Sequence, residues 1–102
     1  MDTFGIAEKA FKELIILFSQ IPNIEKVVLF GSRAMDKYKE GSDIDLALYG
    51  TDIKLNDQLD LSSKLEKLEY PYSYDFQIYK NIKDKDVLDH INRIGIIIYK
   101  KE

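Results

Sequence analysis

Three aspartates are the residues of this chain whose type and spacing are best suited to chemistry. Asp43 and Asp45 are separated by one residue, and Asp75 follows in a later segment that also reads as a strand. Residues i and i+2 of a strand point to the same face, so Asp43 and Asp45 would present two carboxylates about 7 Å apart at the backbone. Their mutual repulsion calls for a cation, and Mg²⁺ prefers carboxylate oxygens together with phosphate oxygens and water. The pattern therefore favours a magnesium site that serves a phosphorylated substrate.

A glycine-serine pair, Gly31-Ser32, follows directly on the apolar run 26–30. A glycine at the end of a strand lets backbone N–H groups approach a phosphate closely, and the serine adds a hydroxyl. The pair is not a P-loop, because the Lys-Ser/Thr ending is absent, and it is not a dinucleotide-binding fingerprint. We interpret the pair as a candidate phosphate-binding turn; taken alone, Ser32 could equally be a helix cap and Gly31 a simple turn.

Apolar periodicity predicts the elements that must position these groups. Helices are predicted over residues 4–18, 56–68 and 84–93. Strands are predicted over residues 26–30, 43–49, 72–79 and 96–99. Asn56 and Asp84 are the predicted N-caps, Gly95 ends the last helix, and a short helical turn followed by a loop is expected over residues 33–41. Helices that alternate with strands indicate an α/β (α+β) fold, a small mixed β-sheet covered by helices.

Composition limits the class of protein. With 102 residues, of which 45% are hydrophobic, we expect one globular domain over residues 1–102. The chain has no cysteine, no signal-like start and no apolar run that could span a membrane, so we expect a soluble cytoplasmic protein without membrane contact. Its net charge of −3 would repel the negatively charged phosphate backbone of a nucleic acid, so no stable nucleic-acid binding is expected.

The glycine-serine pair, the ten-residue gap and the Asp-x-Asp pair together resemble the signature of the DNA polymerase beta-type nucleotidyltransferase superfamily. The resemblance is greatest to its minimal-domain (MNT) branch. It rests on residues 28–34 and 42–46, on Asp75 and on the terminal run 95–99, and it spans residues 27–99. It implies a nucleotidyltransferase-like fold and an enzyme that moves a nucleotide.

Carried over residue by residue, the resemblance makes Asp43 and Asp45 ligands of two Mg²⁺ ions. Asp75 would complete the catalytic metal site and help to deprotonate the acceptor hydroxyl. In the phosphate-binding turn, Gly31 and Ser32 would bind the triphosphate of ATP.

Arg33 follows the glycine-serine pair, and by the same resemblance it would add positive charge near the phosphates of ATP. The chain departs from the family pattern directly afterwards, because Met35 and Asp36 stand where many relatives have a second arginine and a glycine. We expect Asp36 to weaken the local positive field and thereby to weaken phosphate binding more than metal binding.

The resemblance also implies a partner. Members of the minimal branch are commonly encoded beside small helical HEPN-type toxins and act as antitoxins, which implies transfer of AMP from ATP to a toxin tyrosine. The chain lacks the extra helical domain with which larger relatives hold their acceptors, so a separate subunit would recognise the acceptor. The alternative is a non-catalytic antitoxin or scaffold that acts by binding; transfer to a small molecule or a nucleic-acid end is weaker.

Three further positions carry interpretations that the fold can test. Asp75 lies between two aromatic residues, where an unpaired buried carboxylate is costly, so we favour a metal ligand over a surface position. His90, the only histidine, has no second ligand in sight and is assigned no function. The run 94–99 is interpreted as a buried strand, with an exposed sheet edge as the alternative.

Overall fold

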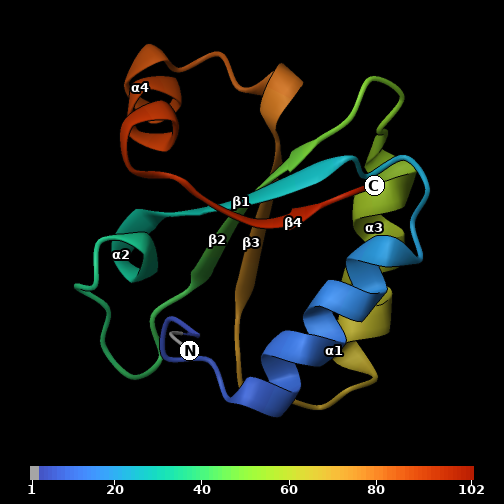
Figure 1. Ribbon diagram of the computed structural model, residues 1–102, viewed down its shortest axis with the longest axis vertical. Coiled ribbons are helices and arrows are strands. Elements are labelled where there is room, and N and C mark those ends of the chain that lie inside the picture. The colour runs from blue at the N-terminus through green and yellow to red at the C-terminus, as the bar shows by residue number, and fades with distance from the viewer. Residues whose placement is uncertain (1–2) are drawn as a thin grey trace.

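The strands of the computed structural model, which describes residues 3–102, form a four-stranded mixed sheet (Figure 1). Its strand order is β3-β2-β1-β4. The strands are β1 (Lys26–Phe30), β2 (Ile44–Tyr49), β3 (Tyr74–Ile78) and β4 (Ile96–Lys100). β1 runs antiparallel to both β2 and β4, whereas β2 and β3 are parallel. This mixed sheet with its helices confirms the predicted fold class.

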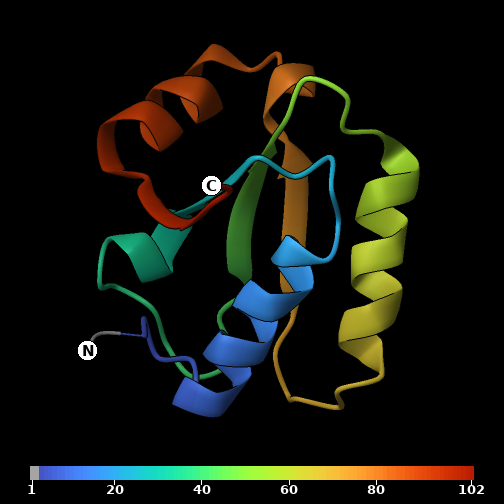
Figure 2. The same ribbon diagram turned by 45° about the vertical axis from the view of Figure 1, so that its right-hand side comes forward.

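Helices cover both faces of the sheet, unequally. The α-helices are α1 (Glu8–Ser19), α2 (Gly31–Ala34), α3 (Leu55–Glu66) and α4 (Lys85–Ile94), and a 3₁₀ turn, η1, spans Tyr79–Asn81. Figure 2 shows α1 and α3 on one side of the sheet and α2 and α4 on the other. Among residues 3–102, no helix is long and apolar enough to cross a membrane.

Alternation along β2 decides which side chains meet which layer. Ile44, Leu46 and Leu48 are fully buried in the core cluster that α1 and α3 close. The intervening Ala47 belongs to a second, smaller cluster with Ile91 of α4. Successive residues of a strand point to opposite faces, so Asp45 shares the α4 side of the sheet with Ala47.

The first helix begins four residues later than its apolar spacing predicts. Phe4 and Gly5 have positive φ angles of 59° and 77°, a left-handed conformation that cannot continue into a right-handed helix. The helix therefore starts at Glu8, while Phe4 packs against Phe11 at a ring distance of 6.3 Å. The apolar pattern indicated which residues face the core, but it also included a turn that precedes the helix.

The predicted N-cap of the helix expected over residues 56–68 is wrong. This helix, α3, starts at Leu55, and Lys54 is its N-cap in place of Asn56. The backbone N–H of Lys54 donates to the Asp57 carboxylate at 2.9 Å, a contact that fixes the first turn. Leu59, an apolar residue within the predicted helix range, is 56% exposed and does not face the core.

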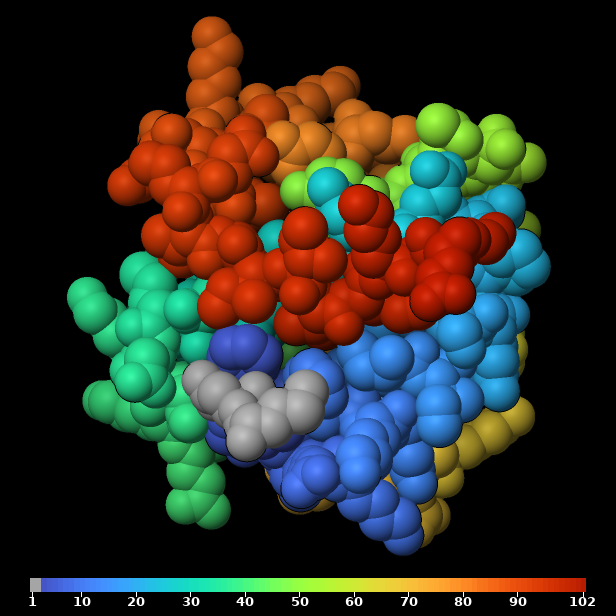
Figure 3. Space-filling view, viewed as in Figure 1, coloured from blue at the N-terminus to red at the C-terminus, as the bar shows by residue number. Residues whose placement is uncertain are grey.

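For the last helix the predicted caps are confirmed, whereas for the last strand the predicted burial is wrong. Asp84 caps α4 by accepting the backbone N–H of Asp86, and Gly95 is the C-cap, both as predicted. The buried interpretation of the terminal strand is wrong, because β4 is an edge strand and Ile97 is 55% exposed. Figure 3 shows residues of β4, in red, crossing the visible surface between α4 and α1.

Candidate functional site

Two of the three predicted aspartates lie on neighbouring strands. Asp45 of β2 is paired in parallel register with Asp75 of β3, and adjacent strands are about 4.8 Å apart. Asp43 immediately precedes β2, and its negative charge acts on Asp45. The strand ladder therefore brings together Asp45 and Asp75, whereas Asp43 precedes the ladder and does not line the same cleft. Asp75 is exposed, so the burial from which its metal role was argued is not observed.

Asp45 and Asp75 line a cleft of about 300 Å³ between the sheet and α4. The cleft is lined by Phe30, Gly31, Asp45, Asp75, Gln77, Asp86, Val87 and His90. None of these lining residues is a lysine or an arginine, so the described walls of the cleft carry several carboxylates and no fixed cation. A phosphorylated ligand would enter such a cleft only together with cations.

The electrostatics of Asp45 reflect this crowding. Burial raises the pKa of Asp45, and the negative charges of Asp75 and Asp43 raise it further. A hydrogen bond with Asp75 acts in the same direction, whereas His90 lowers the pKa. Because neighbouring negative charge disfavours ionised Asp45, a cation that neutralises the cluster would stabilise its ionised form.

A metal ion would need oxygen ligands beyond those of the protein. Across residues 3–102, no three acidic or histidine side chains form a ready-made metal-binding group. Mg²⁺ does not require one, since it is usually held by one or two carboxylates, substrate phosphates and water. The adjacent carboxylates of Asp45 and Asp75 match that donor set, so these residues fit a Mg²⁺ ion that arrives with a nucleoside triphosphate.

The glycine-serine turn lies directly against this carboxylate cluster. Gly31 follows β1 with a φ of 75° and begins α2. A Cβ atom at Gly31 would collide with the carboxylate of Asp45, so the turn requires glycine for its φ angle and for its space. Ser32, the next residue, is half-buried. The structure thus places the glycine-serine pair beside the aspartates.

The side chain of Arg33 lies outside the cleft lined by Asp45 and Asp75, which we call the acidic cleft. Its side chain is 4% exposed, and its Nη1 and Nη2 donate to the carbonyl oxygens of Phe4 and Ser42, each at 2.8 Å. The guanidinium also lies 5.1 Å from the ring of Tyr38. Arg33 lines a separate cleft of about 540 Å³, so the structure does not bring it to the acidic cleft with the other predicted residues.

His90, to which we assigned no function, lines the acidic cleft. Its Nε2 accepts the backbone N–H of Gly31 at 3.1 Å, and its ring packs edge-on against Phe30 at 6.2 Å. Asp86 lines the same cleft from one turn earlier on α4. The spacing of Asp86 and His90, four residues apart on a predicted helix, was the available signal, but it did not reveal which side of the sheet the helix covers.

Comparison with protein families gives a match over most of the chain. Residues 12–102 match the family described as polymerase beta, nucleotidyltransferase. The search of curated proteins found no significant match.

Solved structures of toxin–antitoxin complexes share the fold. A mutant of the MntA-HpeT toxin–antitoxin has a TM-score of 0.69 at 17% identity, over 90% of this chain and 74% of that one. A toxin–antitoxin structure with AMP-PNP has a TM-score of 0.69 at 19% identity, over 95% and 76%.

A third similar structure comes from Shewanella oneidensis and contains a tri-AMPylated HEPN toxin with an MNT antitoxin. Its TM-score is 0.65 at 19% identity, over 92% of this chain and 72% of that one. Identities this low show a shared fold and leave the family assignment to the match over residues 12–102. On that match, the chain belongs to the polymerase beta nucleotidyltransferase family.

Proposed function

We propose that this chain transfers AMP from ATP to a hydroxyl group of a partner protein, and that Asp43, Asp45 and Asp75 hold two Mg²⁺ ions for the reaction. The observation that carries the proposal is the in-register pair of Asp45 and Asp75 in a cleft without a lysine or arginine among its described lining residues. The phosphate-binding turn at Gly31 supports it, because the turn is packed against the same carboxylate.

Each residue has a part that follows from its position. Asp45 is central, since it contacts both the turn and the neighbouring strand, and we assign it to the nucleotide-bound metal. Asp75 is exposed and stands on an edge strand, where an acceptor hydroxyl can approach and release its proton. Bound Mg²⁺ would favour ionisation of that hydroxyl and neutralise charge on the departing pyrophosphate. Ser32 binds the triphosphate through its hydroxyl.

The similar structures suggest the acceptor. One contains an AMPylated HEPN toxin with its MNT antitoxin, and another contains AMP-PNP. A further one is a mutant in which two aspartates, two residues apart, are changed to glutamate, the same spacing as Asp43 and Asp45. By analogy, the acceptor proposed for this chain is a tyrosine of a HEPN-type toxin, and the chain itself is the antitoxin.

The direct test is a labelling experiment on the chain and its HEPN-type partner, purified as a complex. With ATP labelled at the α-phosphate and Mg²⁺, we expect label on the partner with the wild type and none with the Asp43→Asn, Asp45→Asn double variant. Asp60→Asn is the matched control, because Asp60 is an exposed residue of α3 paired with Lys64. Equal labelling by wild type and double variant would contradict the proposal.

A second candidate function is neutralisation of the partner by binding alone. The placement of Arg33 favours it, because this arginine is tied to backbone carbonyls and leaves the described lining of the acidic cleft without an arginine. Co-expression separates the two functions. If the double aspartate variant protects cells from the partner as well as wild type does, binding is sufficient. If protection is lost while the complex persists, transfer is required.

A further inference from the structure

We propose that His90 is a positioning residue that holds the phosphate-binding turn through the backbone amide of Gly31. This inference rests on the proposed nucleotide transfer and adds a residue of α4 to that site. The contact joins residues far apart in the sequence, and it connects the C-terminal helix to the turn at the end of β1.

The hydrogen bond fixes which ring nitrogen faces the turn. The Gly31 N–H donates to Nε2 at 3.1 Å, so Nε2 is the acceptor and Nδ1 is on the far side of the ring. The ring is held from the side by Phe30, at an interplanar angle of 79°. His90 is half-buried, which limits the ability of water to replace it as the partner of the amide.

The N–H group that donates to His90 belongs to the peptide between Phe30 and Gly31. Gly31 has a φ of 75°, and glycine at such an angle puts few steric limits on rotation of the preceding peptide plane. Rotation of that plane would turn the Phe30 carbonyl in the direction that the Gly31 N–H now takes. By accepting the N–H, His90 keeps the plane, and with it Ser32, in the orientation observed.

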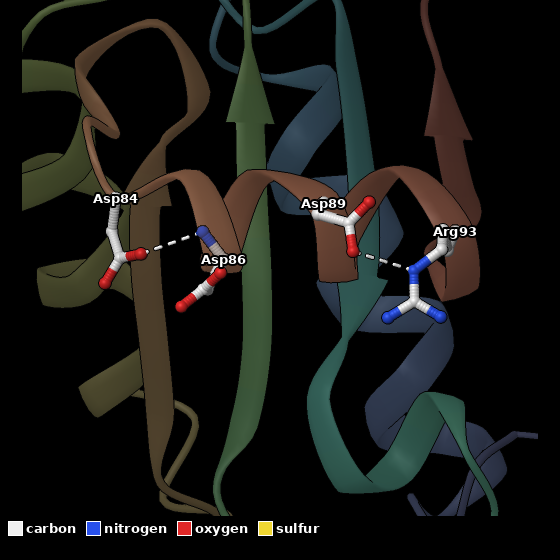
Figure 4. A network of polar contacts seen from close by, with 4 residues as sticks. All are labelled: Asp84, Asp86, Asp89 and Arg93. Atoms are coloured by element: carbon white, nitrogen blue, oxygen red, sulfur yellow. Dashed lines mark hydrogen bonds and ion pairs between the residues drawn. The ribbon is translucent and has the colours of Figure 1, made fainter.

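α4 is built to hold His90 in place. Asp84 caps the helix by accepting the Asp86 N–H at 2.9 Å, and Asp89 pairs with Arg93 at 2.8 Å (Figure 4). Ile91, next to His90, is 2% exposed and packs in the cluster that contains Phe30. The helix therefore has a defined start and a buried anchor beside the histidine.

Two substitutions separate the hydrogen bond from the ring packing. His90→Phe keeps a ring against Phe30 and removes the acceptor, whereas His90→Gln supplies a side-chain oxygen in place of Nε2. With Mg²⁺ present, AMP-PNP binding is measured by calorimetry, and KM and kcat are measured by transfer from labelled ATP. We expect His90→Phe to raise Kd and KM about fivefold, the usual worth of one neutral hydrogen bond. We expect kcat to change less than about twofold and His90→Gln to restore wild-type binding.

The NMR signal of the Gly31 amide provides a readout that does not need transfer activity. Loss of its acceptor in His90→Phe should shift this signal, and His90→Gln should return it toward the wild-type position. Asp89→Asn on the outer part of α4 is the matched control and should leave the signal and the nucleotide Kd unchanged. A fall in melting temperature without a change in Kd or KM would indicate a purely structural role and overturn the proposal.

The remaining outcomes are also decisive. Unchanged or tighter AMP-PNP binding by His90→Phe would overturn the positioning role, and tighter binding would show that His90 competes with phosphate for the Gly31 amide. A wild-type chain that binds no AMP-PNP with Mg²⁺ and transfers no label would contradict the proposed function itself. Normal wild-type binding without any response to His90→Phe would contradict only the role of His90.

Discussion

The two faces of the sheet use the same strands for opposite purposes. The face under α1 and α3 belongs to a continuous apolar cluster that includes Leu46, Phe18 and Leu61, all fully buried. The face toward α4 has a smaller cluster around Ile91, and it leaves Asp45 and its neighbours beside an open cleft. The comparison indicates that burial of apolar side chains under α1 and α3 stabilises the sheet. This stability offsets the repulsion between the carboxylates held close together on the face toward α4.

The largest expected effect falls on transfer activity. Asp45→Asn removes a proposed metal ligand and should lower the transfer rate at least about a hundredfold. The fold should remain intact, because the side chain leaves no cavity in the core. Initial rates with α-labelled ATP measure the effect, and circular dichroism checks the fold. A variant within about twofold of the wild-type rate would remove Asp45 from the chemistry.

The adjacent residue should show the opposite behaviour. Leu46→Ala opens a cavity at a fully buried position and should lower the free energy of unfolding by about 2–5 kcal/mol. Urea denaturation measures this, with Leu59→Ala as the control, since Leu59 is 56% exposed and its truncation should cost less than about 0.5 kcal/mol. Similar losses for both leucines would contradict the division between the two faces.

A third prediction concerns pH. The pKa of Asp45 is raised, mainly by burial and the charge of Asp75, so the folded chain binds this proton more tightly than the unfolded chain does. Its contribution to stability is therefore present at low pH and is lost as pH rises through the folded-state pKa. Without Mg²⁺, the melting temperature of Asp45→Asn minus that of wild type should increase with pH above about 4. A difference that is independent of pH would contradict the crowding of carboxylates.

The features that could be predicted from the sequence are those that depend on neighbouring residues, such as the ends of strands and helices. β1 has its predicted bounds, and α4 has its predicted cap at Asp84 and its predicted end at Gly95. The leucines of β2 and Asp45 lie on opposite faces, a division that follows from the two-residue period of any strand and is therefore readable from the sequence.

What the sequence did not predict depends on contacts between distant segments. The burial of Arg33 requires the carbonyl oxygens of Phe4 and Ser42, and the role of His90 requires α4 to cross the end of β1. Neither contact produces a periodic signal. The exposure of Ile97 likewise depends on strand order, which places β4 at an edge.

The smallest expected effect lies at a departure from the family pattern. Asp36 has a φ of 57°, a left-handed conformation that glycine adopts without strain, which fits the glycine that the family pattern leads us to expect there. Asp36→Gly should stabilise the chain by less than about 1 kcal/mol, whereas Asp36→Ala should destabilise it by a similar amount. Equilibrium unfolding of the three proteins gives the order. If alanine is as stable as glycine, backbone conformation does not govern this position.

The central claim, that the carboxylates of β2 and β3 hold divalent ions for a triphosphate, is tested most directly by Mn²⁺ in place of Mg²⁺. In NMR spectra of the chain with AMP-PNP, substoichiometric Mn²⁺ should broaden the amide signals of Asp45, Asp75 and Gly31 first and leave those of α3 residues sharp. Asp45→Asn should abolish the selective broadening. Broadening centred on another part of the chain, or equal broadening in the variant, would contradict the account.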